Sequence, residues 1–193
     1  MRSVGVRAKV EKAAIALFAA KGVEGVSIGE IAAAAGVSQG ALYRHYRGKE
    51  DLAATLFSTA YLRTGAELAE IRGRQPGFDA RVGAMVAHFC SLYDRDPALF
   101  RFMLIAQHNL LPQVRPGQRT PVEEVAETVG DAVRAGEIAP VDPLAAAAAI
   151  MGIVLQTAIF HIYGRLRGSL SARAPDVARA AIAAVAALGQ VTE

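Results

Sequence analysis

The sequence predicts an all-α protein in which a three-helix helix-turn-helix domain precedes a larger helical domain. Three observations favour this class: apolar residues recur at helical spacing, helix-start signals precede the apolar segments, and no alternating strand pattern competes. Hydrophobic residues make up 53% and charged residues 20% of the 193 positions. This balance excludes a disordered chain. We expect about nine helices and two domains, over residues 1–50 and 51–193.

The first helix is expected over residues 4–21, where four apolar residues share one face. They are Val10, Ala14, Leu17 and Phe18. Gly22 and Gly25 then open a short link.

Two short helices follow, joined by a glycine turn. Ser27 and Glu30 have the spacing of a capping box, which marks a helix start. Gly36 stands where a left-handed residue ends a helix, and Ser38 is the next N-cap. The expected helices cover 28–35 and 39–46. This arrangement is that of a helix-turn-helix, whose second helix can enter the major groove of DNA.

Four of the six later helices also begin at recognisable signals. Lys49-Glu50-Asp51 places acidic groups at the positive end of the fourth helix. Asp96, Thr120 and Asp142 are N-cap residues that each precede a proline, which fits the first helical position. The expected ranges are 49–71, 78–93, 97–110, 121–135, 143–163 and 175–188, with a linker at 72–77 and a loop at 112–117.

Basic charge concentrates at one end of the chain. Residues 1–50 contain eight Lys/Arg and four Asp/Glu, and they include all the lysines of the chain. Residues 51–193 contain thirteen and fourteen. A basic N-terminal quarter favours a polyanionic partner, although a solvated helix face would have the same composition.

Residues 27–52 resemble the N-terminal domain of the TetR family of transcriptional regulators. The resemblance rests on the Ser27-led helix, Ile31-Ala32, Ala35-Gly36-Val37-Ser38, Gly40, Leu42-Tyr43, His45-Tyr46 and Lys49-Glu50-Asp51-Leu52. It implies a homodimer that binds near-palindromic double-stranded DNA, with one recognition helix per protomer. It also implies a C-terminal domain that binds a small molecule.

The resemblance assigns DNA contacts to eight residues. Gln39, Gly40 and Arg44 would face the groove, where Gln pairs with adenine and Arg with guanine. Phosphates would be contacted or flanked by Ser27, Ser38, Tyr43, His45 and Lys49. Gln39 departs from the basic residue that is frequent in the family, and Tyr46 replaces a common Phe. Leu42 is expected in the core.

Residues 143–164 carry no formal charge, and this length would also suit a bilayer. Weakly apolar alanines and the polar Gln156, Thr157 and His161 favour a helix buried in a helical bundle and no membrane contact. The resemblance implies a dimer contact through the last two helices, at about 142–164 and 175–188.

A pocket is expected among the remaining helices. Its candidate lining mixes apolar walls with few polar groups and suggests a mostly apolar small ligand. The candidates are Phe89, Tyr93, Phe102, Met103, His108, Met151, Leu155, Gln156, Phe160 and Tyr163. Any one of them would equally suit an ordinary core.

Catalytic, metal and cofactor sites find no support in the sequence. His88 and Cys90 lie two apart on a helix and point in different directions, and no close-spaced ligand motif surrounds His108 or His161. No phosphate-binding glycine loop or nucleophile elbow occurs. The single cysteine, and charges that interrupt the first residues, favour a cytoplasmic protein without a signal peptide.

The sequence thus favours a ligand-responsive DNA-binding regulator, expected to be a repressor and not an enzyme. Two alternatives stay open. One is a regulator of the same fold that answers to a protein partner or to no ligand. The other is a helical enzyme or carrier.

Overall fold

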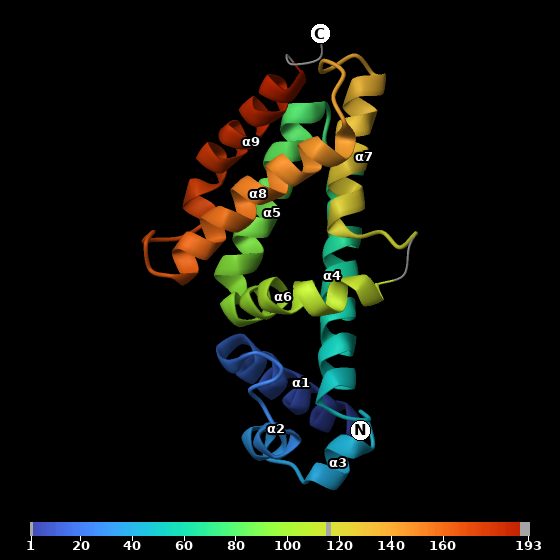
Figure 1. Ribbon diagram of the computed structural model, residues 1–193, viewed down its shortest axis with the longest axis vertical. Helices are drawn as coiled ribbons and strands as arrows, with labels where there is room; N and C mark the ends of the chain where they lie inside the picture. The colour runs from blue at the N-terminus through green and yellow to red at the C-terminus, as the bar shows by residue number, and fades with distance from the viewer. Residues whose placement is uncertain (1, 115–116, 190–193) are drawn as a thin grey trace. The chain divides into compact units, whose positions relative to one another are not determined.

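The computed structural model describes residues 2–114 and 117–189, and within these ranges the chain is helical and contains no strand (Figure 1). The predicted all-α class is confirmed. Two short 3₁₀ helices, η1 (Leu111–Gln113) and η2 (Ser171–Arg173), were not predicted. The α-helices are α1 (Arg2–Lys21), α2 (Ile28–Ala35), α3 (Gln39–Tyr43), α4 (Lys49–Arg74), α5 (Phe78–Arg95), α6 (Pro97–Leu110), α7 (Pro121–Arg134), α8 (Pro143–Ile162) and α9 (Ala174–Gly189).

Contacts divide the chain into two compact units. Unit 1 comprises Met1–Tyr61 and Asp96–Gln118, and unit 2 comprises Leu62–Arg95 and Arg119–Glu193. Helix α4 therefore contributes to both units, and α6 joins the helix-turn-helix in unit 1. The functional division at residue 50 stays a prediction.

The core of unit 1 is built on α1. Val10, Ala14 and Phe18 are fully buried, whereas Leu17 is only half-buried. The Phe18 ring stacks on Phe102 of α6, with ring centroids 5.7 Å apart. This contact joins two segments that are far apart in the sequence into one core.

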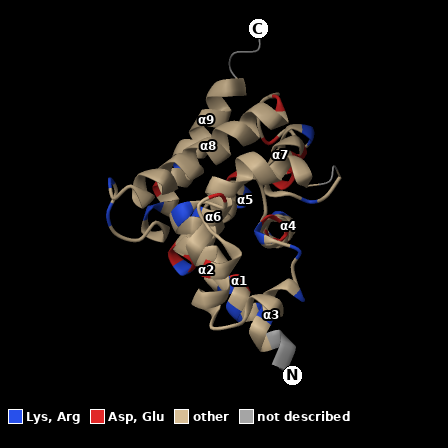
Figure 2. Cartoon of the chain, turned by 60° about the horizontal axis from the view of Figure 1, so that its bottom comes forward, with Lys and Arg blue, Asp and Glu red and all other residues tan. Residues whose placement is uncertain are grey.

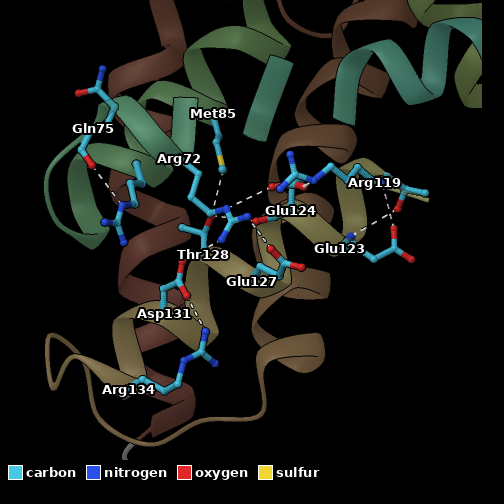
Figure 3. Close-up of polar contacts among 12 residues, drawn as sticks. Arg72, Gln75, Met85, Arg119, Glu123, Glu124, Glu127, Thr128, Asp131 and Arg134 are labelled. Carbon is cyan, nitrogen blue, oxygen red and sulfur yellow. Dashed lines mark hydrogen bonds and ion pairs between the residues drawn. The ribbon is translucent and has the colours of Figure 1, made fainter. Parts of the chain in front are cut away.

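Helix α4 continues to Arg74, through the first residues of the predicted linker. The reason is a set of contacts between Arg72 and α7 (Figure 3). Arg72 Nε lies 3.1 Å from Glu124 Oε2, and Arg72 Nη1 lies 2.9 Å from Asp131 Oδ2. Arg72 Nη2 also pairs with Glu127. Composition alone predicted a loop at 72–77, because it does not show that three carboxylates face this arginine.

Glu124 is the buried centre of this ion-pair network, with 1% of its side chain exposed. Its second carboxylate oxygen lies 3.3 Å from Arg119 Nε. Gly65 of α4 allows the segment at Arg119 to approach, since a Cβ on Gly65 would lie 2.2 Å from the Arg119 carbonyl oxygen. A buried carboxylate is tolerated because two guanidinium groups compensate its charge.

Asp94, near the end of α5, holds the segment before α9. Its carboxylate accepts hydrogen bonds from Ser169 Oγ at 2.6 Å and from the N–H groups of Leu170 at 3.0 Å and Ser171 at 2.8 Å. Desolvation opposes ionisation, but these hydrogen bonds outweigh it and hold the pKa of Asp94 well below its ordinary value.

We expect Asp94→Asn to remove an acid-sensitive part of the stability. The folded-state pKa is depressed, so ionised Asp94 stabilises the fold above the ordinary carboxyl range. This contribution is lost as the pH falls through that range toward the folded-state pKa. Urea unfolding of wild type and variant at about pH 7 and about pH 3 should therefore give a smaller difference at the lower pH. Asp176→Asn, which changes an exposed side chain of α9, is the control, and a pH-independent difference would contradict the prediction.

Helix α8 is the one helix in the described ranges that is long and apolar enough to cross a membrane, with a mean hydropathy of 1.9. Only 28% of the 18-residue segment with this hydropathy is buried within the chain. One face packs inward through Ala146, Ala147, Ile150, Val154 and Ala158. The opposite face, here termed the α8 outer face, is exposed and consists of Ala145, Ala148, Gly152, Gln156 and Phe160.

Candidate nucleic-acid interface

Helix α2 begins at the predicted capping box. Ser27 Oγ accepts a hydrogen bond from the Glu30 N–H at 3.2 Å, while the Glu30 carboxylate accepts one from the Ser27 N–H at 2.8 Å. The Ser27 hydroxyl also donates to this carboxylate at 3.0 Å. Hydrogen bonding from Lys21, and then from Ser27, lowers the pKa of Glu30 to about 2. A phosphate at Ser27 must therefore draw the hydroxyl proton away from Glu30.

The turn between α2 and α3 also follows its predicted chemistry. Gly36 has φ of +65°, and its N–H bonds the Ala33 carbonyl at 3.1 Å. The Val37 N–H reaches the Ala32 carbonyl at 3.0 Å, which completes a Schellman-type end. Ser38 Oγ then accepts from the Ala41 N–H at 3.2 Å and caps α3. Both predicted caps are confirmed.

Helix α3 ends at Tyr43, earlier than the predicted Tyr46. The His45 N–H bonds the Leu42 carbonyl at 2.9 Å, a three-residue spacing that tightens the chain after the helix. Leu42 is fully buried, as predicted, and anchors α3 to unit 1. The helix is therefore held by one face.

The other face of α3 and the residues after it are open to solvent. Tyr43 is 54% exposed, and the remaining members of this face are Ser38, Gln39, Gly40, Arg44 and His45. The Gln39 amide lies against the first turn of α2, because a Cβ built on Gly29 would lie 3.3 Å from Gln39 Nε2. All six residues are accessible to a partner, and their roles in DNA binding stay predictions.

Lys49 is less accessible than these six residues, because neighbouring groups hold its ammonium group. Its Nζ donates to the Glu24 carbonyl at 3.1 Å and lies 3.7 Å from Glu24 Oε2 and 3.9 Å from Glu50 Oε1. Only 20% of its side chain is exposed. A phosphate contact from Lys49, which stays a prediction, would compete with two carboxylates.

Tyr46 ties the end of the motif to α1. It is buried, and its hydroxyl donates to Glu11 Oε1 at 2.7 Å, while Arg7 Nε lies 2.7 Å from the same oxygen. Burial, and then the Glu11 carboxylate, raise the pKa of Tyr46 to about 12. A phenylalanine here could fill the same space but would leave this hydrogen bond unmade.

We therefore expect Tyr46→Phe to lower the free energy of unfolding by about 1 kcal/mol, the usual net value of one hydrogen bond. The aromatic packing is retained, so DNA affinity should change little. Urea unfolding and DNA titration measure the two effects. Equal stability of variant and wild type would show that the Tyr46–Glu11 bond contributes nothing net.

Residues 11–56, which contain α2, α3 and the start of α4, match the bacterial regulatory proteins of the tetR family. These residues form an N-terminal domain of the TetR family. The capping box, the glycine turn and the exposed face of α3 all lie inside the matched region.

Several known proteins are similar to this chain in part of the sequence or in the fold. The transcriptional regulator AcrR of Shigella flexneri is 39% identical over 64 residues, which are 33% of this chain and 30% of AcrR. The match thus spans less than a third of that curated relative. FadR of Bacillus subtilis, solved with stearoyl-CoA, is 19% identical with a TM-score of 0.76, over 91% of this chain and 97% of FadR. A gamma-butyrolactone receptor is 27% identical with a TM-score of 0.69, over 95% and 98%.

Figure 2 colours the lysines and arginines of the chain, and the ion pairs divide the described N-terminal ones into two groups. Arg7, Lys21 and Lys49 are paired with carboxylates. A second group is exposed and forms no ion pair with any described residue; it comprises Lys9, Lys12, Arg44 and Arg47. Sequence reasoning gave Arg47 no role, because a charge count does not separate paired from free cations. A phosphate would reach this second group without first breaking an ion pair.

The ten candidate ligand residues are divided between the compact units. Phe102, Met103 and His108 belong to unit 1, and the other seven belong to unit 2. Phe102 packs on Phe18, and His108 lines a surface hollow with Gln107, Leu111 and Pro112. In unit 2, the ring of Tyr93 meets His161 edge-on at 5.7 Å. A shared ligand pocket for these ten residues stays a prediction.

Proposed function

We propose that this TetR-family chain is a ligand-responsive transcriptional repressor that binds double-stranded DNA in the cytoplasm and leaves its operator when a small, mostly apolar molecule binds. The observation that carries this proposal is that α3 is held by one face and exposes the other. The helix is capped by Ser38, anchored by buried Leu42, and exposes Gln39, Tyr43 and Arg44 together. A short helix held by one face can enter a major groove about 12 Å wide.

The active form in this proposal is a homodimer formed through α8 and α9. The α8 outer face is uncharged and exposed, and its small residues Ala145, Ala148 and Gly152 allow a second helix to approach closely. Exposed alanines of α9, including Ala180 and Ala183, extend the apolar surface. Two recognition helices about 34 Å apart would then meet successive major grooves of a near-palindromic operator.

The C-terminal helices are proposed to bind the ligand. The gamma-butyrolactone receptor, which is similar over almost the whole chain, supports a small organic molecule as the effector. Ligand binding would favour a conformation whose recognition helices no longer fit successive grooves. Its effect on DNA affinity is limited by its difference in affinity for the two conformations.

Selection of bound duplexes from a random DNA pool, at two salt concentrations, tests the proposal. Enrichment of an inverted repeat with about one helical turn between half-sites is the expected result. Weak, salt-sensitive binding without enrichment would contradict a sequence-specific operator. No binding at all would reject the DNA-binding function and favour a role for the helical body alone.

Two substitutions separate base recognition from phosphate binding. Gln39→Ala should relax the preference at one base pair by about 1–3 kcal/mol, because a bidentate amide contact is lost. Lys49→Ala should weaken all sequences alike and flatten the salt dependence by about one unit. Titration of selected and scrambled duplexes over a salt series measures both. If Lys49→Ala binds like wild type while Lys12→Ala does not, phosphate binding belongs to the free cations and not to Lys49.

A further inference from the structure

Unit 1 contains a cavity that neither the DNA interface nor the ten candidate ligand residues explain. Its volume is about 630 Å³, within the range of small-molecule sites. Three segments of unit 1 line it: the link after α1, the first turns of α4 and the C-terminal half of α6. The lining residues are Gly22, Val23, Glu24, Glu50, Asp51, Ala53, Ala54, Ile105, Ala106, Asn109, Leu110 and Gln113.

One side of this cavity is apolar. Ala53 and Ala54 contribute from α4, and Ile105, Ala106 and Leu110 contribute from α6. Ile105 is 44% exposed although it is a large aliphatic residue. An organic group that covered Ile105 would remove apolar surface from water, which is favourable.

The other side of the cavity is acidic. Glu24, Glu50 and Asp51 line it, and no Lys or Arg among the described residues does. Lys49 is a neighbouring cation that lies 3.7 Å from Glu24 and 3.9 Å from Glu50, which are long for strong ion pairs. Asp51 accepts the Arg47 backbone N–H at 2.9 Å. Counted over the described residues, these three carboxylates and Lys49 give this side of the cavity a net negative charge.

We propose that this cavity binds a small organic monocation with an apolar body, such as a protonated hydrophobic amine. The ammonium group would lie among Glu24, Glu50 and Asp51, and the body would pack on Ala54, Ile105 and Leu110. This charge and shape complementarity disfavours a neutral or anionic molecule of the same size. The site shares no residue with the ten candidates for the effector of the proposed function, and its occupancy does not require DNA.

Calorimetric titration of the full chain tests the charge requirement with three compounds that share one apolar body and differ in their head group. They are 4-phenylbutylammonium, 4-phenylbutan-1-ol and 4-phenylbutyrate. The ammonium compound should bind about fivefold or more tightly than the alcohol at low salt, and the carboxylate should bind most weakly. Added salt should reduce the advantage of the cation. Equal affinity for the three compounds would overturn the proposal.

Substitutions of residues that line the cavity test whether the compounds bind there. Glu50→Gln should weaken the ammonium compound about threefold to fivefold and leave the alcohol unchanged. Ala54→Leu should weaken all three compounds by filling the cavity. Glu70→Gln, an exposed carboxylate of α4 in unit 2, is the matched control and should have no effect. Cation binding that survives both Glu50→Gln and Ala54→Leu would reject this cavity as the site, and far-ultraviolet circular dichroism verifies that each variant is folded.

Discussion

Arg72→Met is expected to lower the free energy of unfolding by about 3 kcal/mol or more, because it leaves buried Glu124 without its nearer cation. The Glu124 carboxylate is 1% exposed and lies 3.1 Å from Arg72. Arg119 alone would then compensate it, at 3.3 Å and from an arginine that is 68% exposed. Asp131 and Glu127 would lose the same partner. Urea unfolding at one fixed protein concentration measures the loss.

A double substitution tests whether the cost comes from the uncompensated charge. Arg72→Met with Glu124→Gln removes both charges, so it should recover part of the lost stability. Arg74→Met is the matched control, since Arg74 is exposed and its ion pair among the described residues is with Glu70, one turn away. If Arg72→Met and Arg74→Met are equally stable, the buried network contributes no more than a surface pair.

Gly152→Glu is expected to convert the proposed dimer to a monomer and to weaken binding of the proposed operator by about 100-fold or more. A charge would be placed in the middle of the α8 outer face, where its burial against a second protomer is unfavourable. The operator would then be bound through one recognition helix, and the advantage of two linked contacts would be lost. Sedimentation velocity measures the first effect and titration of the selected duplex measures the second.

The monomer itself should tolerate this change. A Cβ at Gly152 meets no atom within 4 Å, and replacing a helical glycine improves helix propensity. Gly73→Glu is the control, because Gly73 is also an exposed helical glycine with open space but lies on α4. A Gly152→Glu protein that stays dimeric and binds the operator like wild type would reject the α8 outer face as the dimer contact.

The starts of the helices were predictable because their signals are local. Ser27 with Glu30, and Thr120 with Glu123, form the capping boxes that their three-residue spacing indicates. Gly36 ends α2 in the left-handed conformation that its position predicts. A cap depends on atoms within one turn of the chain, so residue type and spacing contain the needed information.

The end of α4 was predicted less well, since it makes contacts that are distant in sequence. Arg72 is helical because α7 presents Glu124, Glu127 and Asp131 to it, more than 50 residues away along the chain. In the sequence, Arg72 lies in a glycine-containing stretch whose composition is typical of a linker. It does not show the carboxylates that complete the helix.

The candidate DNA interface shows the same division. The sequence by itself determined the all-α class, the two capped helices and the exposed residue types on α3, because these follow from local hydrogen bonds and the period of apolar residues. Only the tertiary structure decided which cations are available. Lys49 is held by Glu24 from the preceding link, whereas Lys12 and Arg47 are free of ion pairs with described residues. The physical reason is that charge pairing depends on distance in space, which the order of residues does not specify.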